Sequence, residues 1–364
     1  MSKLSLIILL FITSGCYLAN PLPENPSYWQ YGLPAEEEMD QELLLLINQE
    51  IKSGQYENIK ALVVVRNDKL VFENYYAASN RKELFDADRI SLTISQLAIG
   101  IAIEEGLIIS VETPIIDLLP ISYVSLLQSE PRKSEISLFH LMTHSSGLAW
   151  NEGILTSLSS NNDINIMRDQ MDYTRYQLEK QLEAPPGFRT TFNSGTGVIL
   201  SAVIQHVSGQ TLEEYVKTRL FEPLQINEYT WQADGSGTTD GSAGLFLSAL
   251  NLTKIGYLLN QGGHWNGKQL VSADWISKAT DMQTQITNTF GYGYYFWKFT
   301  DQYVISNLQL ETNDLSLISG AEGTSLFMLP HAQLTVMIVA DTPLYGIFDP
   351  SFFLFRRVIQ AIIP

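Results

Sequence analysis

Apolar side chains recur every three to four residues over several long stretches of the chain. In the first of these, Met39, Leu43, Ile47 and Ile51 are spaced by four, which places them on one face of a helix. The stretch 90–103 is apolar almost throughout and is typical of a buried helix. Helices are therefore predicted over 35–53, 90–103, 196–206, 212–220, 250–259 and 350–362.

Other stretches are short, rich in β-branched and aromatic residues, and separated by turn residues. Asn67-Asp68-Lys69 joins the first two of them, which predicts a hairpin. Strands are predicted over 61–66, 70–75, 315–318, 325–329 and 334–340. Since strands lie near both ends with helices between them, the expected class is mixed α/β (α+β). We expect an antiparallel sheet built from both termini and flanked by helices, with an all-helical subdomain over roughly 110–240.

Composition and charge narrow the class of protein. The chain has 364 residues, of which 45% are hydrophobic and 17% charged, and this balance is typical of an ordered globular protein. The formal net charge of -17 argues against nucleic-acid binding, because that needs basic patches. The five histidines show no metal-ligand spacing, and a thiol-ligated zinc site is excluded because the chain has one cysteine. We expect neither a metal nor a cofactor.

The N-terminus predicts export and a lipid anchor. Lys3 precedes an apolar run over 4–12, which has the length of a signal-peptide core and is too short to span a bilayer. Small residues then precede Cys16, the only cysteine, as in bacterial lipoproteins, although Thr13 stands where leucine is usual. We predict a signal peptide over 1–15, a lipidated Pro-rich tether over 16–35 and a folded domain over 36–364, in a membrane-anchored lipoprotein of the bacterial cell envelope. An ordinary signal peptide with an incidental cysteine is the alternative.

Several sequence blocks occur in a familiar order. The block LFHLMTHSSGL over 138–148, followed by Trp150, is similar to the "LLTHTSGL" block of the β-lactamase-related serine hydrolases, which include class C β-lactamases, DD-peptidases and esterases. Further blocks resemble that family at 185–195, 220–224, 244–268 and 290–293. The resemblance covers roughly 58–342 and implies an antiparallel sheet flanked by helices with an all-helical subdomain, in agreement with the pattern above.

The family's catalytic positions are substituted in this chain. Family chemistry needs a serine nucleophile, a lysine three residues later on the same helix face, and a tyrosine from a second loop. Aligned without gaps, these positions fall on Arg89, Leu92 and Phe192. Arginine stays protonated, leucine has no titratable group and phenylalanine lacks the hydroxyl. A two-residue gap would place Ser91 at the serine position, but Ile94 would then replace the lysine.

The remaining family positions suggest a binding site without a nucleophile. The third motif keeps Gly320 and Gly323, whereas Glu322 and Thr324 depart from the family pattern. Ser91 and Ser95 are interpreted as helix-surface or capping residues. The residues expected to contact a ligand are Arg89, Ser91, Asn193, Ser194, Gly320 and Gly323.

Arg89 is the residue of most interest, because it is expected at a helix N-terminus on the floor of the site. It is predicted either to bind a carboxylate-bearing, peptidoglycan-like ligand or to form an internal ion pair with Asp86, Asp88 or another acid. Three functions follow: a catalytically inactive envelope protein that binds a ligand or protein, a serine hydrolase (esterase, β-lactamase or D-amino-acid peptidase) with a non-standard nucleophile, or a structural envelope protein.

Overall fold

The computed structural model describes residues 29–152, 161–301, 303, 308, 310, 313–320, 323–341 and 350–362. The predicted signal peptide, Cys16 and the tether as far as residue 28 lie outside the described residues, and so does Glu322.

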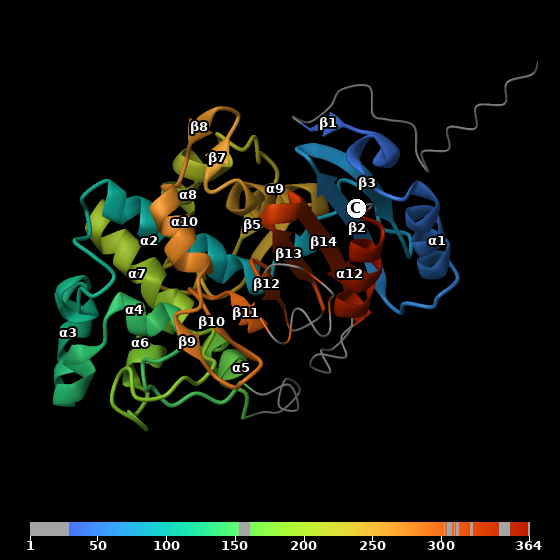
Figure 1. The fold of residues 1–364 in the computed structure, drawn as a ribbon. Helices are drawn as coiled ribbons and strands as arrows, with labels where there is room; N and C mark the ends of the chain where they lie inside the picture. The colour runs from blue at the N-terminus through green and yellow to red at the C-terminus, as the bar shows by residue number, and fades with distance from the viewer. Residues whose placement is uncertain are drawn as a thin grey trace, which may run out of the picture.

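A nine-stranded sheet forms the centre of the molecule, and strands from both ends of the chain meet in its middle (Figure 1). Val64 pairs with Val336 in antiparallel register, which confirms the predicted sheet. The hairpin turn is confirmed too, because Asn67 and Asp68 both adopt positive φ angles. In spatial order the strands are β1 (Gln30–Tyr31), β3 (Lys69–Tyr75), β2 (Ile59–Arg66), β14 (Leu334–Ala340), β13 (Ser325–Leu329), β12 (Ser316–Ser319), β11 (Trp297–Phe299), β10 (Phe290–Tyr292) and β9 (Thr284–Gln285).

The sheet departs from the prediction at both edges. β1 pairs with β3 in parallel, so the sheet is not antiparallel throughout. Strands β9, β10 and β11 extend the other edge, and each has only two or three residues. Periodicity cannot detect strands of this length, because two or three positions do not establish an alternation.

Helices cover both faces of the sheet. α1 (Gln41–Lys52) and α12 (Pro350–Gln360) pack side by side on one face, and α9 (Ala249–Asn260) covers the other (Figure 1). α1 begins six residues later than predicted, because the carboxylate of Asp40 accepts a hydrogen bond from the amide of Leu43 and caps the helix there. The preceding acidic residues lie in a short 3₁₀ turn over Pro34–Glu37.

Most of the other helices lie together on the side of the molecule away from β1 and α1 (Figure 1). Their central pair is α2 (Ile90–Glu104) and α7 (Thr196–Ser208), which pack against each other. The predicted limits of the helical subdomain at 110 and 240 stay a prediction. The other helices are α3 (Ile121–Gln128), α4 (Leu138–Met142), α5 (Asp163–Arg168), α6 (Tyr173–Glu179), α8 (Leu212–Val216) and α10 (Ala273–Thr280).

Short elements complete the described fold. The strands β4 (Phe85–Asp86), β6 (Leu245–Leu247) and β5 (Thr230–Trp231) form a small sheet, and β7 (His264–Trp265) pairs with β8 (Lys268–Gln269). Three more 3₁₀ turns span Ile115–Asp117, Pro131–Glu135 and Pro330–Ala332. The mixed α/β class is therefore confirmed.

α2 is buried along almost its whole length, as its continuous apolar sequence predicts. The prediction that Ser91 and Ser95 lie on the helix surface is wrong, because both are 0% exposed. The Ser95 hydroxyl lies 2.8 Å from the carbonyl oxygen of Gly241 and 3.0 Å from that of Ser91, and hydrogen-bonds to them. A serine hydroxyl that binds backbone carbonyls can be buried in a helix at little cost. A polar residue in the sequence therefore does not by itself indicate an exposed helix face.

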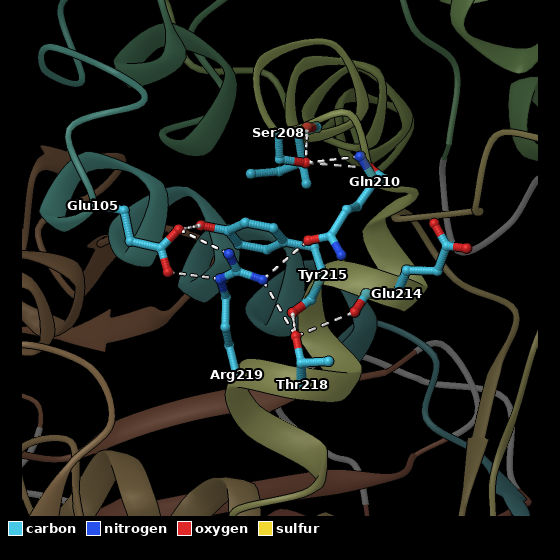
Figure 2. A network of polar contacts seen from close by, with 8 residues as sticks. Glu105, Ser208, Gln210, Glu214, Tyr215, Thr218 and Arg219 are labelled. Atoms are coloured by element: carbon cyan, nitrogen blue, oxygen red, sulfur yellow. Dashed lines mark hydrogen bonds and ion pairs between the residues drawn. The ribbon is translucent and has the colours of Figure 1, made fainter.

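A polar network fixes the C-terminal end of α2 (Figure 2). The carboxylate of Glu105 accepts two hydrogen bonds from Arg219, from Nε at 2.7 Å and from Nη2 at 3.0 Å. It also accepts one from the Tyr215 hydroxyl at 2.9 Å, and the guanidinium carbon of Arg219 lies 3.8 Å from the centroid of the Tyr215 ring. Arg219 belongs to a π-helical turn over Lys217–Phe221, so this network joins α2 to the segment that follows α8.

We expect Arg219→Lys to lower the free energy of unfolding by about 1 kcal/mol, because lysine cannot make the two parallel hydrogen bonds. Arg175→Lys is the matched control, since Arg175 is more exposed and only reaches Asp172 at 3.8 Å and Glu179 at 3.5 Å. Its loss is expected to be below about 0.5 kcal/mol. Urea unfolding at pH 7 measures both losses. Equal losses would show that the hydrogen bonds of Arg219 add no more stability than an exposed ion pair.

Candidate functional site

Arg89 occupies the N-terminal end of α2, where it is the N-cap residue without a side-chain capping bond. Its side chain is 14% exposed and points across to β12, where Nη1 donates to the carbonyl oxygen of Ser319 at 3.2 Å. The guanidinium carbon lies 4.4 Å from the centroid of the Phe192 ring, which is a favourable cation–π distance. The structure therefore brings together Arg89, Phe192 and Ser319, which belong to the three family motifs identified in the sequence.

Glu152 is the acid that faces Arg89. Its Oε1 atom lies 3.7 Å from Nη2 of Arg89, and its side chain is 12% exposed. The other oxygen, Oε2, accepts hydrogen bonds from the indole nitrogen of Trp150 at 2.8 Å and from the amide and hydroxyl of Ser194 at 3.0 and 2.6 Å. The predicted internal ion pair of Arg89 is confirmed, with Glu152 as the partner instead of Asp86 or Asp88.

Leu92 is a core residue and carries no reactive group. It is 1% exposed and belongs to the apolar core between α2 and α7. A Cβ atom built on Gly197 of α7 would lie 2.7 Å from its Cδ2 atom, so the two helices approach closely at this position. The position that the resemblance assigns to a lysine is thus filled by an apolar side chain that packs the helices together.

Phe192 lies against a fully enclosed histidine. The ring centroids of His144 and Phe192 are 4.6 Å apart, and Nδ1 of His144 accepts a hydrogen bond from the amide of Asn193 at 3.2 Å. Burial lowers the pKa of His144 to about 3, and the nearby Arg89 guanidinium acts in the same direction. A neutral histidine that accepts a backbone hydrogen bond favours a structural role, holding the loop that carries the second motif.

Three other predicted ligand contacts, Ser91, Asn193 and Ser194, are all buried. Asn193 and Ser194 are 1% and 3% exposed, and Ser91 is fully buried. Within the described residues, the side-chain amide of Asn193 and the hydroxyl of Ser91 have no hydrogen-bond partner. Buried polar groups of this kind are costly, since each forfeits its hydrogen bonds to water.

Gly320 and Gly323 shape the turn between β12 and β13. The amide of Gly320 donates to the carbonyl oxygen of Thr324 at 2.8 Å, and Gly323 has a φ angle of 84°. A Cβ atom on Gly320 would lie 2.4 Å from Oδ2 of Asp88, so any other residue would displace that carboxylate. The carboxylate of Asp88 therefore fills the space beside Gly320.

Ser316 lies beside a lysine, Lys298, and no sequence motif indicates this contact. Nζ of Lys298 in β11 donates to the hydroxyl of Ser316 in β12 at 3.0 Å, because these two residues are paired across the strands. Burial lowers the pKa of Lys298 to about 8. Lys298 and Ser316 are 7% and 2% exposed, so the pair is closed to a substrate in this structure.

With this geometry established, comparison with known proteins gives the family. The Beta-lactamase family model matches residues 58–345. The chain belongs to the β-lactamase family. An uncharacterized protein of Alkalihalophilus pseudofirmus is 23% identical over 256 residues, which cover 62% of this chain and 66% of that protein.

Solved structures share the β-lactamase-family fold. A penicillin-binding protein homologue from Pyrococcus abyssi has a TM-score of 0.65 at 19% identity, and covers 88% of this chain and 76% of its own. One from Caulobacter crescentus has a TM-score of 0.69 at 13% identity, over 91% of this chain and 99% of that one. EstCE1, a hydrolase with promiscuous acyltransferase activity, has a TM-score of 0.69 at 15% identity, over 91% and 98%.

The described residues of this β-lactamase family member contain neither a metal-binding cluster nor a membrane-spanning helix. In the part of the chain that the structure describes, no three His, Cys, Asp or Glu side chains are grouped so that they could hold a metal ion. The helices within the same residues are all too short or too polar to cross a bilayer.

Proposed function

We propose that this β-lactamase-family protein is catalytically inactive and acts in the bacterial cell envelope by binding a ligand or a protein, held there by a lipid on Cys16. The observation that carries the proposal is the placement of Arg89. At the position that the resemblance assigns to serine, a permanently charged guanidinium is tied to Ser319, faces Glu152 and lies over Phe192. Loss of one catalytic member typically costs about 10⁴- to 10⁶-fold in rate, and three are substituted here.

A working hydrolase with a non-standard nucleophile is the second candidate, because several serine hydroxyls of the described residues, among them those of Ser194 and Ser316, have a partner that could take their proton. Ser194 lies 2.6 Å from Glu152, and Ser316 lies 3.0 Å from Lys298. Both distances are within the range of a nucleophile and its base. Burial disfavours this function, since Ser194 and Ser316 are only 3% and 2% exposed.

Covalent labelling separates the two candidates. Full-length protein in detergent is incubated with a fluorescent penicillin and, separately, with a fluorophosphonate, beside a penicillin-binding protein as positive control. We expect no covalent adduct, because the described site holds no accessible serine with a base. The intact mass and the in-gel fluorescence measure the adduct.

Peptide mapping identifies any labelled residue, with Ser194→Ala and Ser316→Ala as matched variants. An adduct on wild-type protein that disappears in one variant would overturn the inactive assignment and identify the nucleophile. The lipid anchor is tested by a separate experiment. Lipidation that globomycin inhibits should occur in the wild-type protein and be lost in Cys16→Ser.

A further inference from the structure

The ion pair between Arg89 and Glu152 is incomplete. A guanidinium presents Nε and Nη2 along one edge, which is one of the two faces that bind a carboxylate with two parallel hydrogen bonds. Nε of Arg89 is buried and has no hydrogen-bond partner among the described residues. Nη2 faces Oε1 of Glu152 at 3.7 Å, which is longer than a hydrogen bond. This edge of Arg89 therefore lacks the two hydrogen bonds that it is shaped to make.

Glu152 is held in place by other groups. Its Oε2 atom accepts three hydrogen bonds, from Trp150 and from the amide and hydroxyl of Ser194. These bonds fix the carboxylate to the second-motif loop and keep Oε1 away from the edge of Arg89. The protein thus keeps a negative charge in front of Arg89 without letting it bind the guanidinium fully.

The energetic cost of this ion pair favours the replacement of Glu152 by the carboxylate of a ligand. Both side chains are mostly buried, and a buried ion pair offsets its desolvation only when the geometry is good and the remaining donors are satisfied. Neither condition holds for Nε or Nη2. A carboxylate that approached this edge would gain two charge-assisted hydrogen bonds, with the Phe192 ring as an apolar wall on the guanidinium face.

We infer that the Nε–Nη2 edge of Arg89 is a binding site for the carboxylate of a small ligand, and that Glu152 is an internal competitor that the ligand must displace. The inference rests on the binding role proposed above and gives its ligand class. Because two carboxylates cannot share one guanidinium edge without repulsion, Glu152 sets how strongly a ligand must bind before it occupies the site. Ser194 and Trp150 act as positioning residues, since they hold Glu152.

Binding of N-acetyl-D-alanyl-D-alanine, measured by calorimetry at pH 7, tests the inference against the C-terminal amide of the same peptide. We expect the acid to bind and the amide to bind at least tenfold more weakly, because only the acid carries the charge. Glu152→Gln should tighten binding of the acid about tenfold and leave the amide unchanged. 6-Acetamidohexanoate and its amide, a second pair with an unrelated backbone, should show the same difference.

Matched variants separate the effect of Glu152 from a general change of charge. Glu183→Gln removes one negative charge from an exposed ion pair with Arg189 and should not alter affinity. Arg89→Gln combined with Glu152→Gln removes both charges together, so no charge is left buried alone, and thermal unfolding reports whether it folds. This double variant should not distinguish acid from amide.

Two outcomes would overturn the inference: equal affinity of acid and amide in Glu152→Gln, including no binding of either, or no tightening of the acid by Glu152→Gln. Penicillin labelling gives an independent result. An adduct would remove the inactive assignment, whereas the comparison of acid and amide tests the carboxylate site itself.

Discussion

Gly197→Ala is expected to lower the free energy of unfolding by roughly 2–3 kcal/mol, since overpacking of a rigid contact costs this much. A Cβ atom at this position would lie 2.5 Å from the carbonyl oxygen of Gly241 and 2.7 Å from Cδ2 of Leu92. The nearest atom belongs to the backbone, so it cannot be relieved by a change of rotamer. α7 would have to move away from the backbone at Gly241, which would disturb its packing against α2, the helix that Arg89 caps.

Urea unfolding measures this loss, and His206→Ala is the control. His206 is exposed on the same helix, so alanine there tests the residue type without the contact, and its effect is expected to be within about 0.5 kcal/mol. Adding Leu92→Ala to Gly197→Ala should restore no stability, because the contact with Gly241 remains. If Gly197→Ala cost no stability in the Leu92→Ala background, Leu92, and not the backbone, would limit the approach of the helices.

Acid is expected to destabilise the protein through His144. Its pKa is about 3 in the folded protein, against 6.5 in the unfolded chain, so the unfolded chain binds more protons between these values. The stability is therefore complete above pH 6.5 and is lost as the pH falls towards 3. Each pH unit in this window costs about 1.4 kcal/mol, which predicts a loss of about 3 kcal/mol between pH 7 and pH 4.

His144→Asn isolates this contribution. Asparagine tolerates the positive φ angle of 56° at this position and can accept the hydrogen bond from Asn193, but it does not titrate. The unfolding free energy of wild type minus that of His144→Asn should fall by about 3 kcal/mol from pH 7 to pH 4. His264→Asn, at an exposed position, should leave the wild-type slope unchanged. A difference that stays constant with pH would exclude His144 as the source.

The main elements could be predicted because their patterns are long. The predicted helices over 90–103 and 250–259 match α2 and α9 to within a residue at each end, and the strand over 334–340 is found as predicted. Long apolar repeats are decisive because each extra residue adds to the same pattern. The strands β9, β10 and β11 have too few residues for any pattern, and packing against neighbouring strands determines them.

The site was predicted in part. Sequence order identified Arg89, Leu92, Phe192 and Gly320, and the structure brings Arg89, Phe192 and the Ser319–Gly320 turn together. Glu152 was missed, although it follows Trp150 of a recognised block, because a glutamate in a loop has no pattern that indicates its partner. The contact between Lys298 and Ser316 was missed for the same reason, since strand register decides it.

The sequence by itself determined which groups are present: the identities of Arg89, Leu92 and Phe192 exclude the family's serine, lysine and tyrosine whatever the fold does. Side-chain chemistry is local, so it can be read one residue at a time. The tertiary structure decided what those groups face. Arg89 pairs with Glu152, which lies 63 residues further along the chain, and not with the neighbouring Asp86 or Asp88, and only the packing of the loops around α2 decides this.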